Sequence, residues 1–373
     1  MKRTDYEPEI DERFFETAEE GQAFAKANPG MVMIREGDGF VVYGRANAPA
    51  AQADTGFTPR SVKAYLDRHV IGQEDAKTEL ALALFSHRDS YERSGSAKEP
   101  NEGPLMLVGP TGSGKTFMVQ KACELIDLPF VHVNAAAMVP EGIVGVSISE
   151  IVDRIETAAK GDEKKASHAV VFLDEIDKLF HENSGDYGDR VVHQLLRFIE
   201  GEYIEHKSGF GLDSSTVQFI LGGAFSWLRD DDADTVTVQP MGFIREAVSY
   251  VPSTGLSPES LMHNGVPPEI LGRVRSIVNL EPLDGETYYR ILTQSESSPL
   301  RGIVAKIERY GDRVQIDDDV LRFLSEAAAR SPFGVRALHQ MLKKLLKEAL
   351  FKAPEPGRRV HRITSKDIIF NIE

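Results

Sequence analysis

The sequence predicts an α/β protein in which helices cover both faces of a parallel β-sheet, followed by a smaller, mostly helical domain. Short apolar runs alternate with segments of helical periodicity in the central part of the chain, as in sheets whose strands are buried on both faces. These runs are 105–108, 130–133, 169–173 and 216–221. The first run leads into a glycine-rich loop and a helix, the order that a phosphate-binding loop needs. From about residue 283 the patterns are mostly helical, which predicts the second domain.

The composition is that of an ordinary globular protein. The chain has 373 residues, of which 41% are hydrophobic and 27% are charged, enough for two or three domains with cores of their own. Its formal net charge is −15. Broad nucleic-acid binding depends on Lys and Arg side chains that neutralise phosphates. We therefore expect no nucleic-acid partner, although a local basic patch stays compatible with this charge.

Cysteine content and hydropathy indicate the compartment. The single cysteine, Cys123, cannot form an intrachain disulfide, so a reducing compartment is expected. The first residues contain no apolar signal core, and no apolar run approaches the ~20 residues of a membrane span. The sequence thus predicts a soluble, cytoplasmic protein without a membrane partner.

Residues 1–56 are predicted to form an acidic arm, a small α-β-β unit and a linker. The segment Gly37-Asp-Gly39 between two apolar runs is a hairpin signature. A unit of ~40 residues seldom has enough core to stand alone, so we expect it to dock on the body, self-associate or bind another molecule. Its expected parts are an arm at 1–12, a helix opened by the capping box Thr17–Glu20, and strands at 31–34 and 40–43.

The large α/β domain is expected at 57–282 and the helical domain at 283–373. In the last predicted helix, apolar residues recur at helical spacing from Val335 to Leu346, and Pro354 follows its end. Beside the four strands, the large domain is expected to contain a short helix from Thr58, a second helix that runs to about His87, and a helix after the glycine-rich loop. Two further helices are expected near 150–158 and 191–198. The elements expected in the helical domain are helices at 285–309, 318–330 and 333–352 and a short strand at 360–363.

The glycine-rich loop has the residues of a nucleoside-triphosphate site. Glycines let backbone N–H groups curl around phosphate oxygens, and the following helix adds the positive end of its dipole. Lys115 can reach the β- and γ-phosphates, and the Thr116 hydroxyl can bind Mg²⁺. The residues expected to contact ATP here are Gly109, Pro110, Thr111, Gly112, Ser113, Gly114, Lys115, Thr116 and Phe117.

A second motif completes the expected site. The apolar run 169–173 ends in Asp174 and Glu175. A carboxylate at the end of a strand beside the phosphate loop can hold Mg²⁺, and we assign that role to Asp174. Glu175 is placed to activate water for attack on the γ-phosphate. An acidic pair after an apolar run is often only a solvated strand end, but together with the loop it predicts hydrolysis of a nucleoside triphosphate.

Several stretches in order along the chain resemble the ClpX-type AAA+ unfoldases, over roughly residues 58–373. The resemblance implies a large ATPase domain and a small helical domain, assembled as a ring of six. In that family the ring hydrolyses ATP, with Mg²⁺, to unfold proteins and pull them through a central pore, commonly into a ClpP-like peptidase. The stretches are His69–Lys77, the glycine-rich loop, Asp174–Lys178, Leu221–Phe225, Pro268–Arg273 and Gly334–Arg336.

The resemblance also implies roles for single residues. Val70 and Ile71 would contact adenine, with an ordinary core contact as the alternative. Arg273 would act as an arginine finger in the neighbouring subunit's site, and Arg275 is its rival for this role. Arg336 would sense nucleotide from the small domain; otherwise it is a solvated or salt-bridged helix residue.

Three departures from the family pattern concern partners rather than hydrolysis. The cysteine-rich zinc module is missing, because one cysteine cannot supply a four-ligand site. The pore-loop position reads Gly142, Ile143, Val144 and Gly145, with Ile143 where the family has an aromatic residue. The family's peptidase-docking loop carries an aliphatic-Gly-Phe tripeptide, and Met241, Gly242 and Phe243 in the long segment 229–260 resemble it, although a match of three residues is a weak one.

These observations predict an ATP-dependent protein unfoldase or remodelling motor that acts on protein substrates as a homo-oligomeric ring, with or without a ClpP-like peptidase. The alternative is a nucleotide-switched scaffold that holds a partner without threading it. Ile143 favours the scaffold, whereas the intact Asp174 and Glu175 pair favours true turnover.

Overall fold

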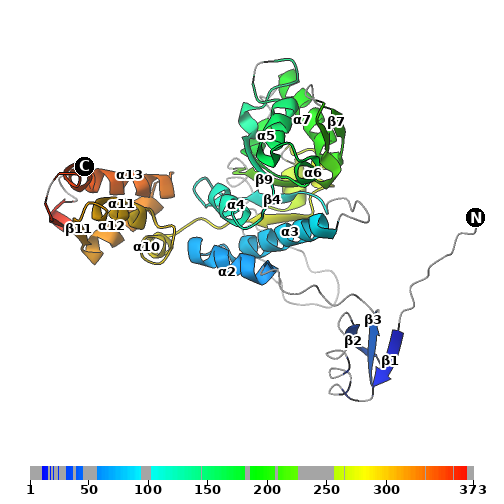
Figure 1. The fold of residues 1–373 in the computed structure, drawn as a ribbon, viewed down its shortest axis with the longest axis horizontal. Coiled ribbons are helices and arrows are strands. Elements are labelled where there is room, and N and C mark those ends of the chain that lie inside the picture. The colour runs from blue at the N-terminus through cyan, green and yellow to red at the C-terminus, as the bar shows by residue number, and fades with distance from the viewer. Residues whose placement is uncertain are drawn as a thin grey trace, which may run out of the picture. The chain divides into compact units, whose positions relative to one another are not determined.

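The computed structural model divides the chain into two units, residues 1–57 and 58–373, which are described separately (Figure 1). Among the residues that the structure describes, no helix is long and apolar enough to cross a membrane. The described residues are 11–15, 17, 20, 24, 31–36, 39–44, 57–93, 102–143, 145–180, 185–205, 209–225, 256–263, 265–331, 333–355 and 357–367.

The first unit contains a three-stranded antiparallel sheet in the order β1-β3-β2. The hairpin expected from the sequence is present as β2 (Met31–Glu36) and β3 (Gly39–Gly44). β1 (Asp11–Phe15) pairs with the other side of β3, so the prediction of a loose arm reaching residue 12 was wrong at its end. The Thr17 hydroxyl accepts a hydrogen bond from the Glu20 amide (3.4 Å), as expected for the start of the predicted helix; most of that helix lies outside the described residues.

A five-stranded parallel sheet forms the centre of the second unit, in the order β10-β4-β9-β6-β5. Four of its strands match the apolar runs of the sequence, and all residues of β4 and β9 are buried. Such complete burial explains why these strands appear as continuous apolar runs rather than alternating ones. The strands are β4 Leu105–Val108, β5 Phe130–Asn134, β6 Val170–Asp174, β9 Gln218–Gly223 and β10 Ser276–Asn279.

Helices cover both faces of this sheet, as the alternation of patterns predicted (Figure 1). One face packs against α5 and α7 through a hydrophobic core that includes Val171 and Leu173 of β6. The helices α3 and α4 contact the sheet as well. The helices are α2 Pro59–His69, α3 Glu74–Arg93, α4 Lys115–Cys123, α5 Ile148–Ala159, α6 Glu163–Ser167, α7 Gly185–Glu200, α8 Pro258–His263 and α9 Pro268–Leu271.

Shorter elements connect this framework. The hairpin of β7 (Tyr203–Glu205) and β8 (Gly211–Asp213) follows α7, and neither strand was expected from the sequence. The remaining elements are the 3₁₀ helices η1 Ala135–Ala137, η2 Ile176–Leu179 and η4 Ser214–Thr216.

The C-terminal part of the second unit is mostly helical and has a core of its own. The predicted helix 285–309 is two helices, because Ser298 caps a new helix whose first residue is Pro299. The predicted helix 333–352 also divides, since the backbone at Leu346 leaves the helical region (φ −94°, ψ 10°). The elements are α10 Gly285–Thr293, α11 Pro299–Glu308, β11 Arg313–Ile316, α12 Asp318–Ala329, α13 Val335–Leu345, α14 Lys347–Lys352 and β12 Val360–Ile363.

Candidate nucleotide-binding site

The carboxyl ends of three strands of the parallel sheet, β4, β6 and β5, bring the predicted site residues to one edge of the sheet, with β9 between β4 and β6. β4 leads into the glycine-rich loop, and β6 ends at Asp174. β5 ends at Asn134, which lies opposite Asp174 in the strand register. Ligands of open α/β sheets bind at this edge, so the arrangement identifies the place where the chemistry of the loop and of the acidic pair can meet.

The loop 109–114 forms a backbone cradle between β4 and α4. Gly112 and Gly114 have φ angles of 84° and 97°, a region that favours glycine because a Cβ atom strains the backbone there. Gly114 is the N-cap of α4, so the N–H groups of the first helical turn open toward the cradle. Such a loop ahead of a helix N-terminus binds anions. The exposed residues beside the cradle are Thr111 and Phe117.

Two buried side chains in this loop fit a phosphate ligand. The Ser113 hydroxyl is buried and has no hydrogen-bond partner, which is costly unless a ligand or water satisfies it. Lys115 is only 7% exposed, and its ammonium donates to the carbonyls of Gly109 (2.6 Å) and Pro110 (3.2 Å). The loop carbonyls thus hold a buried cation beside backbone N–H groups, where it can turn toward phosphate oxygens.

The Thr116 hydroxyl and the Asp174 carboxylate lie in direct contact. Thr116 Oγ1 donates to Asp174 Oδ2 at 2.5 Å, although 58 residues separate the two positions in the chain. A hydroxyl and a carboxylate are among the oxygen ligands that Mg²⁺ binds. The residues present therefore fit a magnesium ion held between the glycine-rich loop and β6.

The electrostatics of Asp174 favour its charged form. Its side chain is 17% exposed, and this burial by itself raises the pKa. The neighbouring His132 and Thr116 side chains and the Glu175 amide lower it more strongly, so the pKa of Asp174 lies below the ordinary value of an aspartate. The His132 imidazole nitrogen Nε2 is 3.6 Å from Asp174 Oδ2, and its ring stacks on Phe172. Asp174 is therefore an anion throughout the neutral pH range.

Glu175 has an unusual backbone that turns its side chain away from the strand. Its φ and ψ angles are 58° and 35°, the left-handed region that costs most side chains ~1 kcal/mol. The Glu175 amide donates to Asp174 Oδ1 (3.0 Å), which helps to hold this geometry. Strained residues of this kind concentrate at functional sites, and here the strain separates two adjacent carboxylates so that they can take different roles.

Asn134 is a site residue that the sequence analysis did not identify. Its side-chain nitrogen donates to Glu175 Oε2 (3.2 Å), and its side-chain oxygen accepts from the Ala136 amide (2.9 Å). The second bond fixes the amide group, which then positions the Glu175 carboxylate. A polar residue at the end of the apolar run 130–133 was the available signal, but only strand pairing shows that this run lies beside β6.

The helical domain contributes to the same site. A Cβ atom on Gly112 would lie 3.3 Å from the Cα atom of Gly334, so the start of α13 packs against the glycine-rich loop. Gly334 itself has a φ of 52°, and a Cβ there would come within 2.7 Å of the Tyr288 hydroxyl. Arg336, in the first turn of α13, is exposed next to this contact. The predicted nucleotide sensor thus lies at the boundary between the loop and the helical domain.

Comparisons with known proteins agree with this geometry. Residues 105–223 match the model of the ATPase family associated with various cellular activities (AAA), which spans β4 to β9. The chain is 30% identical over 341 residues to the ATP-dependent Clp protease ATP-binding subunit ClpX of Treponema denticola, covering 84% of this chain and 81% of the relative. The chain belongs to the ClpX family of AAA ATPases. It therefore binds and hydrolyses ATP.

Two further relatives have the same name and a similar extent. The ClpX subunit of Bacteroides thetaiotaomicron is 27% identical over 346 residues, covering 86% of this chain and 84% of the relative. That of Borrelia duttonii is 29% identical over 343 residues, covering 84% of this chain and 79% of the relative. The similarity thus extends well beyond the AAA match at residues 105–223.

The two residues expected to contact adenine lie just beyond α2. Val70 is the C-cap residue of that helix, and both Val70 and Ile71 are only 8% exposed. This burial is compatible with either of the two expectations, an adenine contact or an ordinary core contact. The following residues, Gly72 and Gln73, have φ angles of 72° and 59°, so the chain turns sharply before α3 begins.

Both arginines expected near the subunit boundary form ion pairs in this ClpX-family chain. The guanidinium of Arg273, after α9, lies 2.7 Å from Glu200 at the end of α7, and the Arg273 side chain is 46% exposed. Arg275 pairs with Glu102 ahead of β4 and is 24% exposed. Arg273 is thus the more accessible of the two rivals.

The predicted pore loop extends from a fixed base. Val139 N donates to the carbonyl of Val146 (2.9 Å), and Ile143 at the tip is 43% exposed. A Cβ on Gly145 would lie 2.7 Å from Val139 Cγ2, so glycine permits the chain to return close to its start. Gly142, with φ 90°, has open space around it. Val144 and the tripeptide Met241–Phe243 lie outside the described residues.

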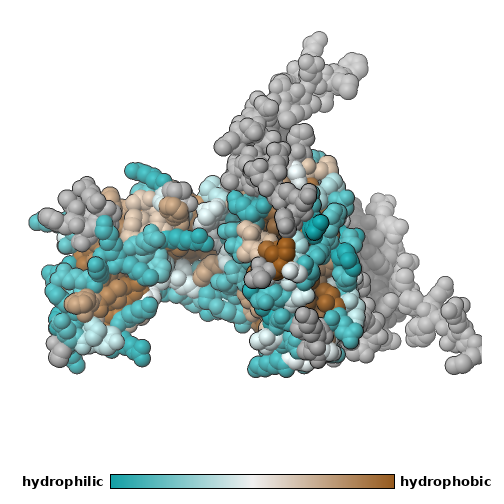
Figure 2. All heavy atoms as spheres, turned by 90° about the horizontal axis from the view of Figure 1, so that it is seen from above, coloured by the Kyte–Doolittle hydropathy of each residue, from teal (hydrophilic) through white to brown (hydrophobic). Residues whose placement is uncertain are grey.

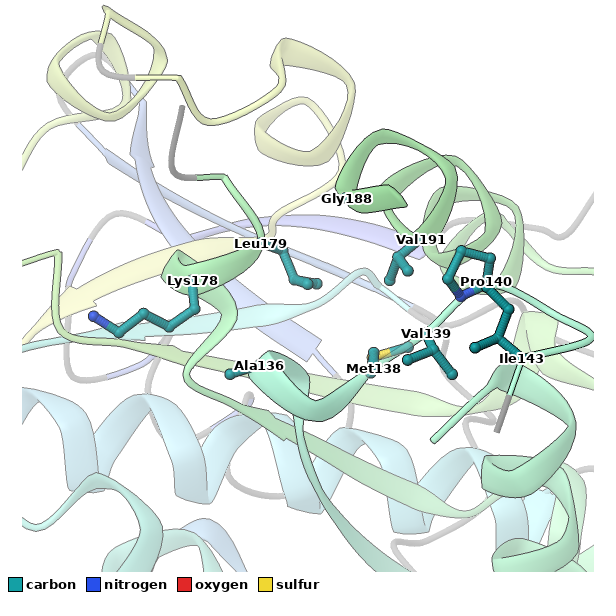
Figure 3. A pocket seen from close by; sticks show the side chains of 9 residues that line it. All are labelled: Ala136, Met138, Val139, Pro140, Ile143, Lys178, Leu179, Gly188 and Val191. Carbon is teal, nitrogen blue, oxygen red and sulfur yellow. The ribbon is translucent and has the colours of Figure 1, made fainter. Parts of the chain in front are cut away.

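A cavity of about 370 Å³ lies behind this loop. Figure 3 shows Ile143 and Pro140 of the loop beside Val191 of α7, with Leu179 of η2 farther in. Lys178 extends away from the apolar side chains at the other end. The loop that the family resemblance associates with substrate therefore lines one end of a half-open, mostly apolar pocket.

Proposed function

We propose that this protein is an ATP-driven unfoldase or remodeller of other proteins, active as a homohexameric ring in the cytoplasm. The observation that carries this proposal is the assembled site at the sheet edge, in which Thr116 contacts Asp174 while Glu175 turns away to Asn134. A scaffold that only binds nucleotide does not need a separately positioned carboxylate. This arrangement therefore supports turnover.

In the proposed reaction each side chain has one role. Lys115 and the backbone of residues 109–114 bind the phosphates of ATP, and Thr116 and Asp174 hold Mg²⁺. When bound, the metal neutralises charge on the phosphate oxygens. Glu175 takes a proton from the attacking water, and Asn134 keeps the Glu175 carboxylate in position until the site closes. Val70 and Ile71 contact the adenine ring, and Arg336 contacts nucleotide from the helical domain.

A ring explains the position of Arg273. We propose that it leaves Glu200 and reaches into the site of the neighbouring subunit, where its charge stabilises the transferring phosphoryl group. Its 46% exposure and its place at the end of α9 support this role over Arg275, whose guanidinium pairs with the segment that leads into β4. Monomers would then hydrolyse ATP negligibly.

The surface of the helical domain supports self-association. Figure 2 shows hydrophobic residues among the hydrophilic ones on its visible face. Contiguous exposed apolar patches mark interfaces, whereas single exposed apolar side chains are ordinary. The ring contact that we propose would cover part of the large apolar side chains exposed on this domain. They are Tyr310, Phe323, Phe333, Phe351 and Val360, between 44% and 79% exposed.

Each of the proposed domains has its own role. Residues 57–282 form the ATPase domain and 283–373 the helical domain, in line with two separate hydrophobic cores. The unit at 1–56 takes the place of a zinc module and selects clients or adaptors. The exposed Ile143, with Gly142, Val144 and Gly145, grips the client in the pore.

A ClpP-like peptidase is a further proposed partner. The relatives are named as ATP-binding subunits of an ATP-dependent Clp protease, and Met241–Phe243 is the segment of this chain that we assign to docking. The alternative is a nucleotide-switched scaffold without a peptidase, which the aliphatic side chain of Ile143 favours because it offers a smaller gripping surface than an aromatic ring. We expect no nucleic-acid partner for either function.

The test begins with a pull-down from cells that express the Glu175→Gln variant, purified in ATP and compared with the wild type. A client that co-purifies only with the variant is then purified and mixed with the wild-type ring and ATP. Loss of the client's native amide protection in ATP, but not with the variant, would support unfolding. Stable, ATP-dependent binding of a client that stays folded would establish the scaffold instead. Retention of a peptidase, and its loss on replacing Met241–Phe243, would test the protease partnership.

A further inference from the structure

The segment that connects the two domains begins against the glycine-rich loop. Residues 280–284 join β10 to α10. The Leu280 amide donates to the Val108 carbonyl (2.7 Å), and a Cβ on Gly109 would lie 2.7 Å from Leu280 Cβ. The first residue of this linker therefore has no room to move independently of the loop that holds phosphate.

The next residue of the linker is held by the side chain of Gln73. Gln73 Nε2 donates to the Glu281 carbonyl (2.8 Å), and the Glu281 amide donates to Gln73 Oε1 (3.0 Å). One side chain thus occupies both backbone groups of one residue, as a neighbouring strand would. Because the bonds involve only the backbone of residue 281, they do not depend on the exposed Glu281 side chain.

Gln73 is itself held rigidly between α2 and α3. Its backbone has a φ of 59°, and its carbonyl accepts from the Lys77 amide (3.0 Å). The Lys77 ammonium, only 2% exposed, lies between carboxylates of Asp67 (2.5 Å) and Glu74 (2.6 Å). A buried charge with two partners anchors the turn from both helices. The position of Gln73 therefore follows the turn 70–73 closely.

The end of α2 is also bonded to the helical domain. The Ser295 hydroxyl donates to the His69 carbonyl (2.7 Å), and the Glu296 amide donates to the Arg68 carbonyl (2.9 Å). His69 Nδ1 lies 2.7 Å from the Ser297 hydroxyl. The turn 70–73 thus lies between one contact with the helical domain and one with the linker, and a shift of the turn has to act on both.

We propose that Gln73 is a positioning residue that couples the turn 70–73 to the linker, so that ATP binding changes the relation between the two domains. This role rests on the proposed contact of Val70 and Ile71 with adenine. ATP orders the turn, Gln73 transfers this restraint to residue 281, and the helical domain with Arg336 closes on the nucleotide. Asparagine is one methylene shorter and cannot span the same gap, whereas glutamate keeps the length but loses the donor.

The test uses hydrogen exchange in the Glu175→Gln protein, in which bound ATP persists. In this parent, ATP should slow exchange in both 109–116 and 280–284. Gln73→Gly suits the positive φ and removes the side chain, and Gln73→Glu keeps its size. In Gln73→Gly the Glu281 amide should exchange about tenfold faster, because its acceptor is lost, and ATP should protect 109–116 but no longer 280–284. Gln73→Glu keeps this acceptor and loses only the donor to the Glu281 carbonyl, so its effect on both quantities should be smaller. The control Glu281→Ala should behave as the parent.

The outcomes separate the coupling from the nucleotide site. If ATP still slows exchange of 280–284 in Gln73→Gly, which lacks both bonds to residue 281, the coupling role is wrong although the site stands. If ATP fails to protect 109–116 in the parent, the proposed site is wrong, and the coupling with it. In the background with Glu175 intact, Gln73→Gly should lower kcat about fivefold and change KM less than about twofold, since closure rather than binding is affected. If Gln73 has only a structural role, the variant should lose stability, and kcat should not fall more than KM changes.

Discussion

The sheet edge that we propose as the ATP site and the loop 139–146 differ in how their side chains are restrained. At the edge, Thr116, Asp174 and Glu175 each have a hydrogen-bond partner at 2.5–3.2 Å. At the loop tip, Ile143 is 43% exposed and lines a half-open pocket. Chemistry requires groups fixed to a fraction of an ångström, whereas gripping varied clients requires an apolar surface that can adapt. The two regions should therefore respond to mutation in different ways.

The largest expected effect is on ATP turnover and comes from a substitution at the sheet edge. Glu175→Gln should lower ATP turnover about a thousandfold, because only the carboxylate that accepts the proton of water is lost. Binding of ATP should stay within about threefold of the wild type, since Lys115, Thr116 and Asp174 are unchanged. Steady-state hydrolysis and equilibrium binding of a fluorescent ATP analogue measure the two quantities. Near-normal turnover would remove Glu175 from its role.

The second-largest expected effect concerns Arg273, which we propose completes the ATP site of the neighbouring subunit. Arg273→Ala should lower turnover about a hundredfold, while Arg275→Ala, its matched control, should lower it less than about fivefold. Mixing Arg273→Ala with Glu175→Gln subunits should restore part of the activity, because some neighbours then combine an intact Glu175 with an intact Arg273. Two inactive variants that stay inactive in mixed rings would show that Arg273 does not act in trans.

The third prediction concerns the loop alone. Ile143→Ser should slow ATP-dependent unfolding of a client about tenfold and change ATP turnover less than about twofold, because the apolar contact is lost while the edge is untouched. Ile143→Phe should increase the unfolding rate, since it adds gripping surface. Client unfolding and phosphate release, measured in the same sample, separate the two effects. Equal loss of both activities in Ile143→Ser would contradict the distinction drawn between loop and edge.

The smallest effect tests the base of the loop. Gly145→Ala should weaken the closure of the loop by about 1 kcal/mol more than Gly142→Ala. A Cβ at position 145 would meet Val139 Cγ2 at 2.7 Å, whereas one at position 142 has open space. Hydrogen exchange of the Val139 amide, which donates to Val146, measures this closure. Equal exchange rates in the two variants would mean that Val139 yields without cost.

Much of the site was predictable because its signals are local. The glycine-rich loop, the strand before it and the acidic pair are contiguous motifs, and each determines its own conformation through glycines or buried apolar runs. Asn134 was missed because its role depends on the pairing of β5 with β6, which no local pattern contains. Gln73 likewise has its partner at Glu281, 208 residues farther along.

The fold shows the same division between local and distant causes. β11 (Arg313–Ile316) was not expected, since its pairing partner is β12 at the far end of the helical domain. The edge strand β10 was missed because polar residues stand at both of its ends and its two apolar residues are too few to form an apolar run. The break at Pro299 had a sequence signal that the helical periodicity of 285–309 concealed.

The sequence by itself determined the class of fold, the phosphate loop, the acidic pair and the family, because short-range geometry and residue chemistry suffice for each of them. Only the tertiary structure decided which strand end faces Glu175, which acidic residue pairs with Arg273, and which backbone Gln73 holds. These contacts join residues that are far apart in the chain. Their geometry depends on the packing of the whole sheet and its helices, and no window of sequence contains that packing.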